Sequence, residues 1–285
     1  GLMASYRGVT VLQVNARDAT GVLEVIRATD VERLAASTLL SNRAIARCLF
    51  SRRVIVAPTA EDREVYERVA QRQFGRYDIA FIHSHGPQNL PEILRVLASA
   101  KIPACVIGEL ELLGSPRAFS ELIEATSGTE AEATWLGTCD KFTRMLEDPV
   151  SDEGTGFGIR QMETELRRIS SGQTLDVDEA TANISDQGGE YVHKKRLRLR
   201  ENGLDAIDDD FRPWVEQLMD ELRSSGVFIS AGGRLQGWID FGVPLLPEDW
   251  LFNALQEIDR GECPVPLETF VGEMLDHLDA AGRQD

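Results

Sequence analysis

The sequence has few cysteines, few aromatic residues and no long apolar run. No apolar stretch approaches the roughly 20 residues that cross a bilayer, so we expect no membrane span. The N-terminus lacks the basic-then-apolar pattern of a secretion signal. The four cysteines stand far apart and form no CxxC pair. This spacing is typical of reduced thiols in a cytoplasmic protein and argues against a disulfide framework or a zinc site.

Basic residues are scarce as well. The chain of 285 residues has 30 Lys and Arg against 47 Asp and Glu, which gives a formal net charge of −17. Such a charge disfavours non-specific attraction to nucleic acid or to an anionic membrane. The one dense basic run is HKKRLRLR at 193–200, and its candidates for contact with DNA or RNA are Lys194, Lys195, Arg196 and Arg198. The competing interpretation of this run is a solvated helix face.

Short apolar runs alternate with helical patterns between residues 53 and 113. Three of these runs are predicted to be buried strands: Val54–Ala57, Ile79–Ile82 and Ala104–Ile107. A first helix is expected to begin after Thr59, a plausible N-cap, and to end near Phe74. A second helix is expected over Glu92–Ala100. This β-α-β-α-β order with short connections is typical of a parallel sheet covered by helices.

The loops that follow these strands are the first place to look for chemistry. In open parallel sheets the ligand crevice lies beyond the carboxyl ends of the strands. Three loops are expected to converge there: Ala57–Glu61, His83–Asn89 and Gly108–Leu113. The sequence therefore predicts a candidate site at one edge of the sheet.

The rest of the chain is predicted to be mainly helical. Two β-prone runs, Val9–Val14 and Val22–Arg27, suggest a hairpin or an edge pair, and Val31–Leu49 has helical spacing. A long helical region is expected from Pro116 to about Arg223. A strand and two amphipathic helices are expected after it: Val227–Ile229, Pro247–Ile258 and Leu267–Leu278. Three tryptophans in apolar contexts are predicted to be core residues rather than platforms for stacked bases: Trp214, Trp238 and Trp250.

The predicted loops and the late strand carry a recurring set of residues. In chain order these are VAPTAE at 56–61, GPQN at 86–89, KIP at 101–103, GELELL at 108–113, and GVF with GRLQGW at 226–238. The order resembles the TOPRIM half of OLD-family (overcoming lysogenisation defect) proteins, which join an ABC-type ATPase to a TOPRIM nuclease. That family has Val-Glu-Gly with a second acid four residues later, then Asp-x-Asp, then Gly-Glu-Leu-Glu-x-Trp. The resemblance covers most of the chain and implies a TOPRIM-like sheet.

Several acids of the family pattern are replaced in this chain. Ala57 stands where the resemblance implies a glutamate that binds metal and serves in acid–base chemistry, and Pro58 replaces a glycine. Arg234 and Gln236 replace both acids of the late motif. A guanidinium at position 234 would repel a cation. Alternatively, it would bind phosphate in place of the metal, and Arg234 is therefore a further candidate for nucleic-acid contact.

Three glutamates remain from the acidic pattern. Glu61 matches it unchanged, and Glu109 and Glu111 keep the acid-x-acid spacing with one more methylene than aspartate. Mg²⁺ requires hard oxygen ligands in near-octahedral geometry at about 2.1 Å. Glu61, Glu109 and Glu111 are therefore the candidate ligands for one Mg²⁺ or Mn²⁺ ion, and the candidate catalytic residues of an active enzyme. His83 and His85 suggest a transition-metal site as an alternative, against a polar loop whose histidines bond to the backbone.

The predicted fold class is α/β: a TOPRIM-like, Rossmann-like parallel sheet flanked by helices, with a mainly helical accessory region. Residues 1–52 are expected to form a hairpin and a helix that lead in from an ATPase. Residues 53–115 are the predicted TOPRIM core, and residues 116–225 are the helical insertion. Residues 226–285 are expected to add a return strand and the C-terminal helices that complete the TOPRIM domain.

The predicted function is that of a degenerate nuclease module, weak or inactive, acting in DNA processing or phage defence. The chain has no Walker A sequence, so we expect no ATP site in it and an ABC-type ATPase domain in cis or in trans. DNA and a second copy of the chain are the other expected partners. The alternatives are an active Mg²⁺- or Mn²⁺-dependent DNA endonuclease, and a protein-interaction scaffold without nucleic-acid binding.

Overall fold

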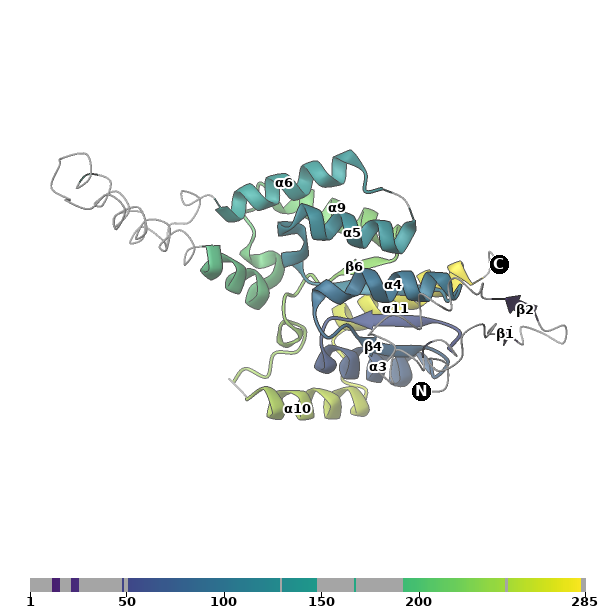
Figure 1. The fold of residues 1–285 in the computed structure, drawn as a ribbon. Coiled ribbons are helices and arrows are strands. Elements are labelled where there is room, and N and C mark those ends of the chain that lie inside the picture. Colours follow the sequence, from purple (N-terminus) through teal and green to yellow (C-terminus); the bar gives the residue numbers. More distant parts are fainter. Residues whose placement is uncertain are drawn as a thin grey trace.

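The computed structural model describes residues 12–15, 22–25, 48, 51–128, 130–147, 167, 192–243 and 246–282 (Figure 1). The predicted N-terminal strand pair is present, since β1 (Leu12–Asn15) pairs antiparallel with β2 (Val22–Val25). The helix predicted over Val31–Leu49 lies outside the described residues except for Cys48, which is helical.

A four-stranded parallel sheet lies at the centre of the fold, in the order β4-β3-β5-β6. Its strands are β3 (Val54–Ala57), β4 (Ala80–His83), β5 (Ala104–Gly108) and β6 (Val227–Ile229). Successive side chains of a strand point to opposite faces. Val54 and Val56 accordingly belong to the core on one face, and Ile55 and Ala57 to the core on the other. Both faces are buried, which is why these strands are continuous apolar runs.

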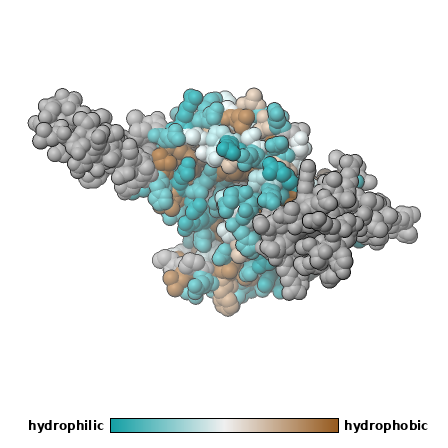
Figure 2. Space-filling view, viewed as in Figure 1, coloured by the Kyte–Doolittle hydropathy of each residue, from teal (hydrophilic) through white to brown (hydrophobic). Residues whose placement is uncertain are grey.

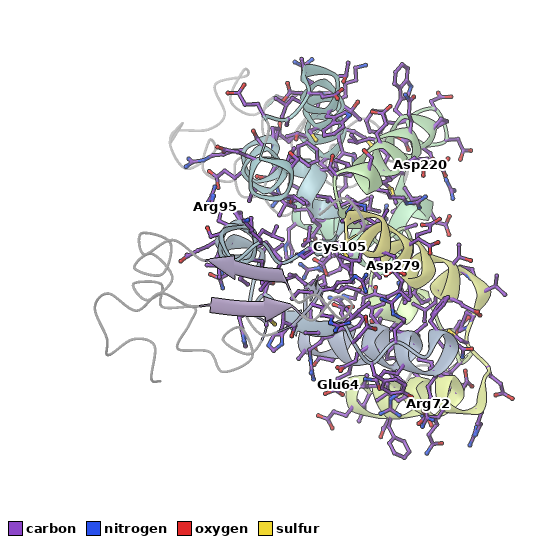
Figure 3. All side chains as sticks on the ribbon, turned by 90° about the vertical axis from the view of Figure 1, so that its right-hand side faces the viewer. Glu64, Arg72, Arg95, Cys105, Asp220 and Asp279 are labelled. Atoms are coloured by element: carbon purple, nitrogen blue, oxygen red, sulfur yellow. The ribbon has the colours of Figure 1, made fainter. Side chains whose placement is uncertain are left out.

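Helices cover both faces of the sheet, which confirms the predicted α/β fold. One face packs against α4 (Leu90–Ser99) and α5 (Pro116–Ser127), and the other against α3 (Ala60–Phe74) and α11 (Val265–Ala281). The outer side of α3 carries α10 (Pro247–Arg260) (Figure 1). Figure 3 shows the layers edge-on, with Asp220 of α9 at the top, Glu64 and Arg72 of α3 at the bottom, and Cys105 of β5 between them.

The predicted helical region contributes further helices to the first face. They are α6 (Ala133–Glu147), an unlabelled helix at 192–202, and α9 (Arg212–Ser224), which packs on β6. Short 3₁₀ turns connect these elements: η3 (Pro87–Asn89), η4 (Leu110–Gly114), η6 (Gly203–Ala206) and η7 (Leu235–Gly237). The chain returns to the same sheet after these helices, because β6 pairs with β5.

One tryptophan departs from the prediction that all three lie in the core. Trp250 is 5% exposed and Trp238 is partly buried, but Trp214 is 53% exposed. Trp214 occupies the first turn of α9, whose buried positions are instead Val215, Leu218, Met219 and Leu222. The local run is apolar enough to suggest burial, but the helical phase turns this ring outward.

The visible surface is mostly hydrophilic, with apolar residues in small separate groups (Figure 2). One group lies at the lower end, where Figure 1 places α10, and Phe252 and Leu246 are exposed there. Within the described ranges, no helix combines the length and apolarity needed to span a bilayer.

An ion-pair network connects the amino ends of the strands to α11. Arg53 precedes β3 and pairs with Asp78 at 3.1 Å and with Asp279 of α11 at 3.2 Å. Arg76 pairs with the same two carboxylates at 2.9 and 3.0 Å. The hydrogen bond from Arg76 holds the pKa of Asp78 below its ordinary value, and burial opposes this shift.

We expect the network to make the fold acid-sensitive. A carboxyl group whose pKa is lowered by folding stabilises the native state above its unfolded pKa, about 3.9 for aspartate, and this contribution disappears as the pH falls through the folded pKa. The urea midpoint should therefore fall between about pH 5 and pH 3, and Asp78→Asn should flatten this dependence. The control is Asp209→Asn, which removes an exposed aspartate that forms no ion pair in the described part of the chain. Equal pH profiles for the two variants would contradict the assignment.

Candidate functional site at the carboxyl ends of the strands

The loops after the four parallel strands meet at one edge of the sheet, and three of them are the loops that were predicted to converge there. The loop after β3 turns directly into α3, and Thr59 caps that helix. Its Oγ1 accepts from the Asp62 N–H at 3.1 Å and donates to Asp62 Oδ2 at 2.7 Å. This capping box holds the Asp62 side chain in a buried position. Burial raises the pKa of Asp62, and the hydrogen bonds from Thr59 oppose that rise.

Polar groups continue inward from Asp62. Tyr66 lies one helical turn later and is 1% exposed. Burial raises the pKa of Tyr66, the charge of Asp62 adds to the rise, and the neighbouring Trp238 and Ser230 oppose it. Ser230 follows β6 and is buried; its N–H donates to the Gly108 carbonyl at 2.9 Å. The buried Trp238 Nε1 has no hydrogen-bond partner among the described residues.

Glu109 and Glu111 face an arginine from a distant segment. Arg200 Nη2 lies 2.8 Å from a carboxylate oxygen of Glu111 and 3.8 Å from one of Glu109. Burial raises the pKa of Glu109, whereas the charge of Arg200 lowers it; Glu111 and Asp62 add to the rise. The acidic pair is therefore partly neutralised by a cation that belongs to the chain itself.

Backbone contacts place Arg200 at this edge. The Arg234 N–H donates to the Arg200 carbonyl at 2.6 Å, and the Leu204 N–H donates to the Ala231 carbonyl at 2.8 Å. These bonds join the end of helix 192–202 to the loop after β6. Gly203 and Gly233 have positive φ, +58° and +72°, where the two backbones cross. A Cβ at Gly203 would overlap the Ala231 carbonyl oxygen, so the crossing requires glycine.

Glu61 does not share the arginine that pairs with the other two predicted acids. It is exposed on the first turn of α3, and its charge acts on His83. His83 Nε2 and His85 Nδ1 are 3.1 Å apart, and His85 has a positive φ of 55°. Burial lowers the pKa of His83, the neighbouring His85 lowers it further, and Glu61 opposes the shift. The two imidazoles contact each other, and both the transition-metal site and the backbone-bonded loop stay predictions.

The binding of Mg²⁺ or Mn²⁺ by Glu61, Glu109 and Glu111 stays a prediction, and the arrangement of these side chains bears on it. In the part of the chain that the structure describes, no three His, Cys, Asp or Glu side chains are grouped to hold a metal. Glu109 and Glu111 both face Arg200, whereas the charge of Glu61 acts on His83. Ala57 is fully buried among apolar residues on the α3 face. Its methyl side chain has no atom that could bind a metal.

The predicted nucleic-acid residues lie on two elements. Helix 192–202 carries Lys194, Arg196 and Arg198 with exposed side chains, while Lys195 Nζ donates to the Met145 carbonyl of α6 at 2.7 Å. Arg234 is exposed in the loop after β6, at the N-cap of η7. The helical setting agrees with the competing interpretation of a solvated face, and contact with DNA stays a prediction.

Four residues of the site were given no role from the sequence: Asp62, Tyr66, Arg200 and Ser230. For two of them, Asp62 and Tyr66, the sequence contains a local pattern. Thr59-x-x-Asp62 is a capping-box pattern, and Tyr66 follows Asp62 at the i+4 spacing that shares a helix face. Arg200 belongs to the basic run, but no local pattern indicates that it reaches the acidic pair. Asp62, not Glu61, is the α3 acid whose charge acts on Glu109.

No protein-family model matches the sequence, and no curated protein matches it. The solved structures include two of the C-terminal region of the Xanthomonas campestris pv. campestris OLD protein, phased with mercury and with platinum. The first is 15% identical at a TM-score of 0.32, covering 82% of this chain and 98% of that one. The second is 14% identical at a TM-score of 0.33, covering 82% and 96%. The chain is thus similar to the C-terminal region of an OLD protein, at scores that leave its family unassigned.

Proposed function

We propose that this chain is a TOPRIM-like module without metal-dependent nuclease activity, acting beside an ABC-type ATPase in DNA processing or phage defence. The ion pair between Arg200 and Glu111 carries the proposal. A guanidinium within 2.8 Å of Glu111 and 3.8 Å of Glu109 supplies the positive charge that a metal would supply to those carboxylates. A divalent cation would have to displace Arg200 before it reached them.

Two further observations support the loss of activity. Two-metal hydrolysis requires one ion to activate water and another to stabilise the leaving oxygen, about 4 Å apart. Ala57 offers no carboxylate, and Arg234 lowers the pKa of Glu109 by adding positive charge to the same edge. The proposed roles for DNA and for the ATPase rest on the motif resemblance, and the exposed basic side chains of helix 192–202 are the proposed DNA contacts.

A plasmid assay tests cleavage and binding together. Supercoiled plasmid is incubated with the protein in Mg²⁺ or Mn²⁺ and run on one gel, where nicking gives the open circle and binding gives retardation. We expect nicking no greater than that of the Glu109→Ala/Glu111→Ala double variant. Retardation should be lost when Lys194, Lys195 and Arg196 are changed to glutamate, because phosphate contacts dominate DNA affinity.

A second variant separates a blocked site from a dismantled one. Arg200→Ala removes the cation from the acidic pair but does not restore a carboxylate at Ala57, so we expect it to stay inactive. Arg117→Ala, which removes an exposed α5 arginine paired with Glu121, controls for the loss of one positive charge. The proposal would be wrong if the natural sequence nicked plasmid in a metal-dependent way and the double variant did not. That result would establish an endonuclease.

A further inference from the structure

A groove of about 700 Å³ runs between the outer sides of α6 and α9, away from the sheet edge. Its walls include two tryptophans, one lysine, two glutamates and uncharged polar side chains such as Thr138 and Gln217; the first five are Trp135, Trp214, Lys141, Glu132 and Glu221. The Trp135–Glu221 and Lys141–Trp214 contacts show that the two helices run antiparallel along it. The proposed function makes no use of this surface.

The aromatic part of the groove is open to solvent. Trp214 is 53% exposed, although a tryptophan normally buries most of its large apolar area. Lys141 Nζ lies 4.7 Å from the centroid of the Trp214 ring, so the face of the ring already attracts a cation. Across the groove, Gly137 leaves space, because a Cβ added there would meet nothing within 4 Å.

The acidic part of the groove lacks a cation. One oxygen of Glu221 accepts from Trp135 Nε1 at 2.7 Å, and the other accepts from Gln217 Nε2 at 2.8 Å. Both donors are neutral, and Glu221 forms no ion pair within the described residues. Glu132, at the same groove, likewise pairs with no Lys or Arg there. Two carboxylates therefore line the groove without an ion pair to a Lys or Arg of the described residues.

We propose that this groove binds an arginine-bearing peptide segment of a partner protein. A planar guanidinium stacks on an indole, and it pairs with a carboxylate through two parallel N–H groups. One arginine of the segment would stack on Trp214 and a second would pair with Glu221, and an ammonium serves both contacts less well. On binding, the arginine takes the place of Lys141 over Trp214, and the Lys141 ammonium returns to solvent. A phosphate-bearing ligand is disfavoured, because Glu221 and Glu132 would repel it.

Fluorescence anisotropy tests the proposal. A fluorescein-labelled peptide, in which three arginines are separated by alanines, is titrated with the full chain. Trp214→Ala should weaken binding about tenfold, and Glu221→Gln about fivefold, because each removes the contact with one arginine of the peptide. Lys141→Ala should tighten binding about threefold, because it removes the competing cation. The tightening is a result that mere structural damage would not produce.

Matched variants control for the net charge of −17, which attracts any basic peptide. Glu121→Gln removes an acid outside the groove. Phe252→Ala removes an aromatic ring of α10 that is 63% exposed. Both should bind the peptide within twofold of the natural sequence. If Trp214→Ala binds as tightly as Phe252→Ala, or if the peptide does not bind at all, the proposal fails. Because Trp214 is exposed, its alanine variant should keep the melting temperature and remain a valid test.

Discussion

Replacing Gly203 by alanine is expected to lower the free energy of unfolding by about 4 kcal/mol. Two terms add up here: overpacking against fixed atoms costs about 1–3 kcal/mol, and a side chain at positive φ costs about 1–2 kcal/mol. The overlapped atoms are the backbone of Ala231, Gly232 and Gly233, which lack the freedom of a side-chain tip. Relief would require breaking the Leu204–Ala231 and Arg234–Arg200 hydrogen bonds.

The same change at another glycine separates these terms. Gly75 caps α3 with a φ of 63°, and a Cβ there meets nothing within 4 Å. Gly75→Ala should therefore cost only the conformational term, about 1 kcal/mol. Chemical denaturation of both variants measures the difference. Equal losses would mean that the crossing between helix 192–202 and the loop after β6 is looser than the structure shows.

Phe228→Ala should destabilise the fold by about 4 kcal/mol, the middle of the range for large buried aromatic residues. Phe228 is 1% exposed in β6, and its ring meets Phe270 and His277 of α11 edge-on, at centroid distances of 6.2 and 5.8 Å. Alanine would leave a cavity between the sheet and α11. For a chain of this size the melting temperature should fall by about 10 °C.

An exposed phenylalanine provides the control for this cavity. Phe252 on α10 is 63% exposed, so Phe252→Ala should change stability by no more than about 0.5 kcal/mol. The comparison also tests whether the C-terminal region belongs to the same cooperative unit as β3 to β5. A loss of stability confined to α11, with an unchanged main unfolding transition, would contradict the single sheet.

The elements of the sheet were predicted to within one residue at each strand end. Val54–Ala57 and Val227–Ile229 were placed correctly, Ile79–Ile82 was shifted by one residue, and Ala104–Ile107 was one residue short. These strands are short apolar runs bounded by turn residues, a local signal that burial on both faces makes strong. The start of α3 was equally local, because Thr59 and Asp62 cap the helix within one turn.

The candidate site was predicted only in its position. That chemistry gathers at the carboxyl ends of the strands follows from parallel topology. The pairing of Glu111 with Arg200 joins residues 89 positions apart, and no periodicity reports such a contact. Glu61 and Asp62 are adjacent in sequence, yet helical geometry turns Asp62 inward and Glu61 outward, because neighbouring residues on a helix point about 100° apart.

Trp214 illustrates the same limit on the surface. Its apolar sequence context predicted a core residue, but the phase of α9 places Val215 and Leu218 inside instead. The resulting exposed ring lines the proposed arginine groove.

The sequence by itself determined the α/β class, the strands, the capped start of α3 and the edge where polar groups collect. Each of these depends on residues within a few positions of one another, whose hydrophobicity and capping act locally. Only the tertiary structure decided which charges meet. The packing of helix 192–202 across a glycine crossing brought Arg200 onto Glu109 and Glu111, and the pairing of α6 with α9 formed the groove. Such contacts depend on how distant segments pack, and packing energy is spread over the whole core rather than encoded at the residues that finally touch.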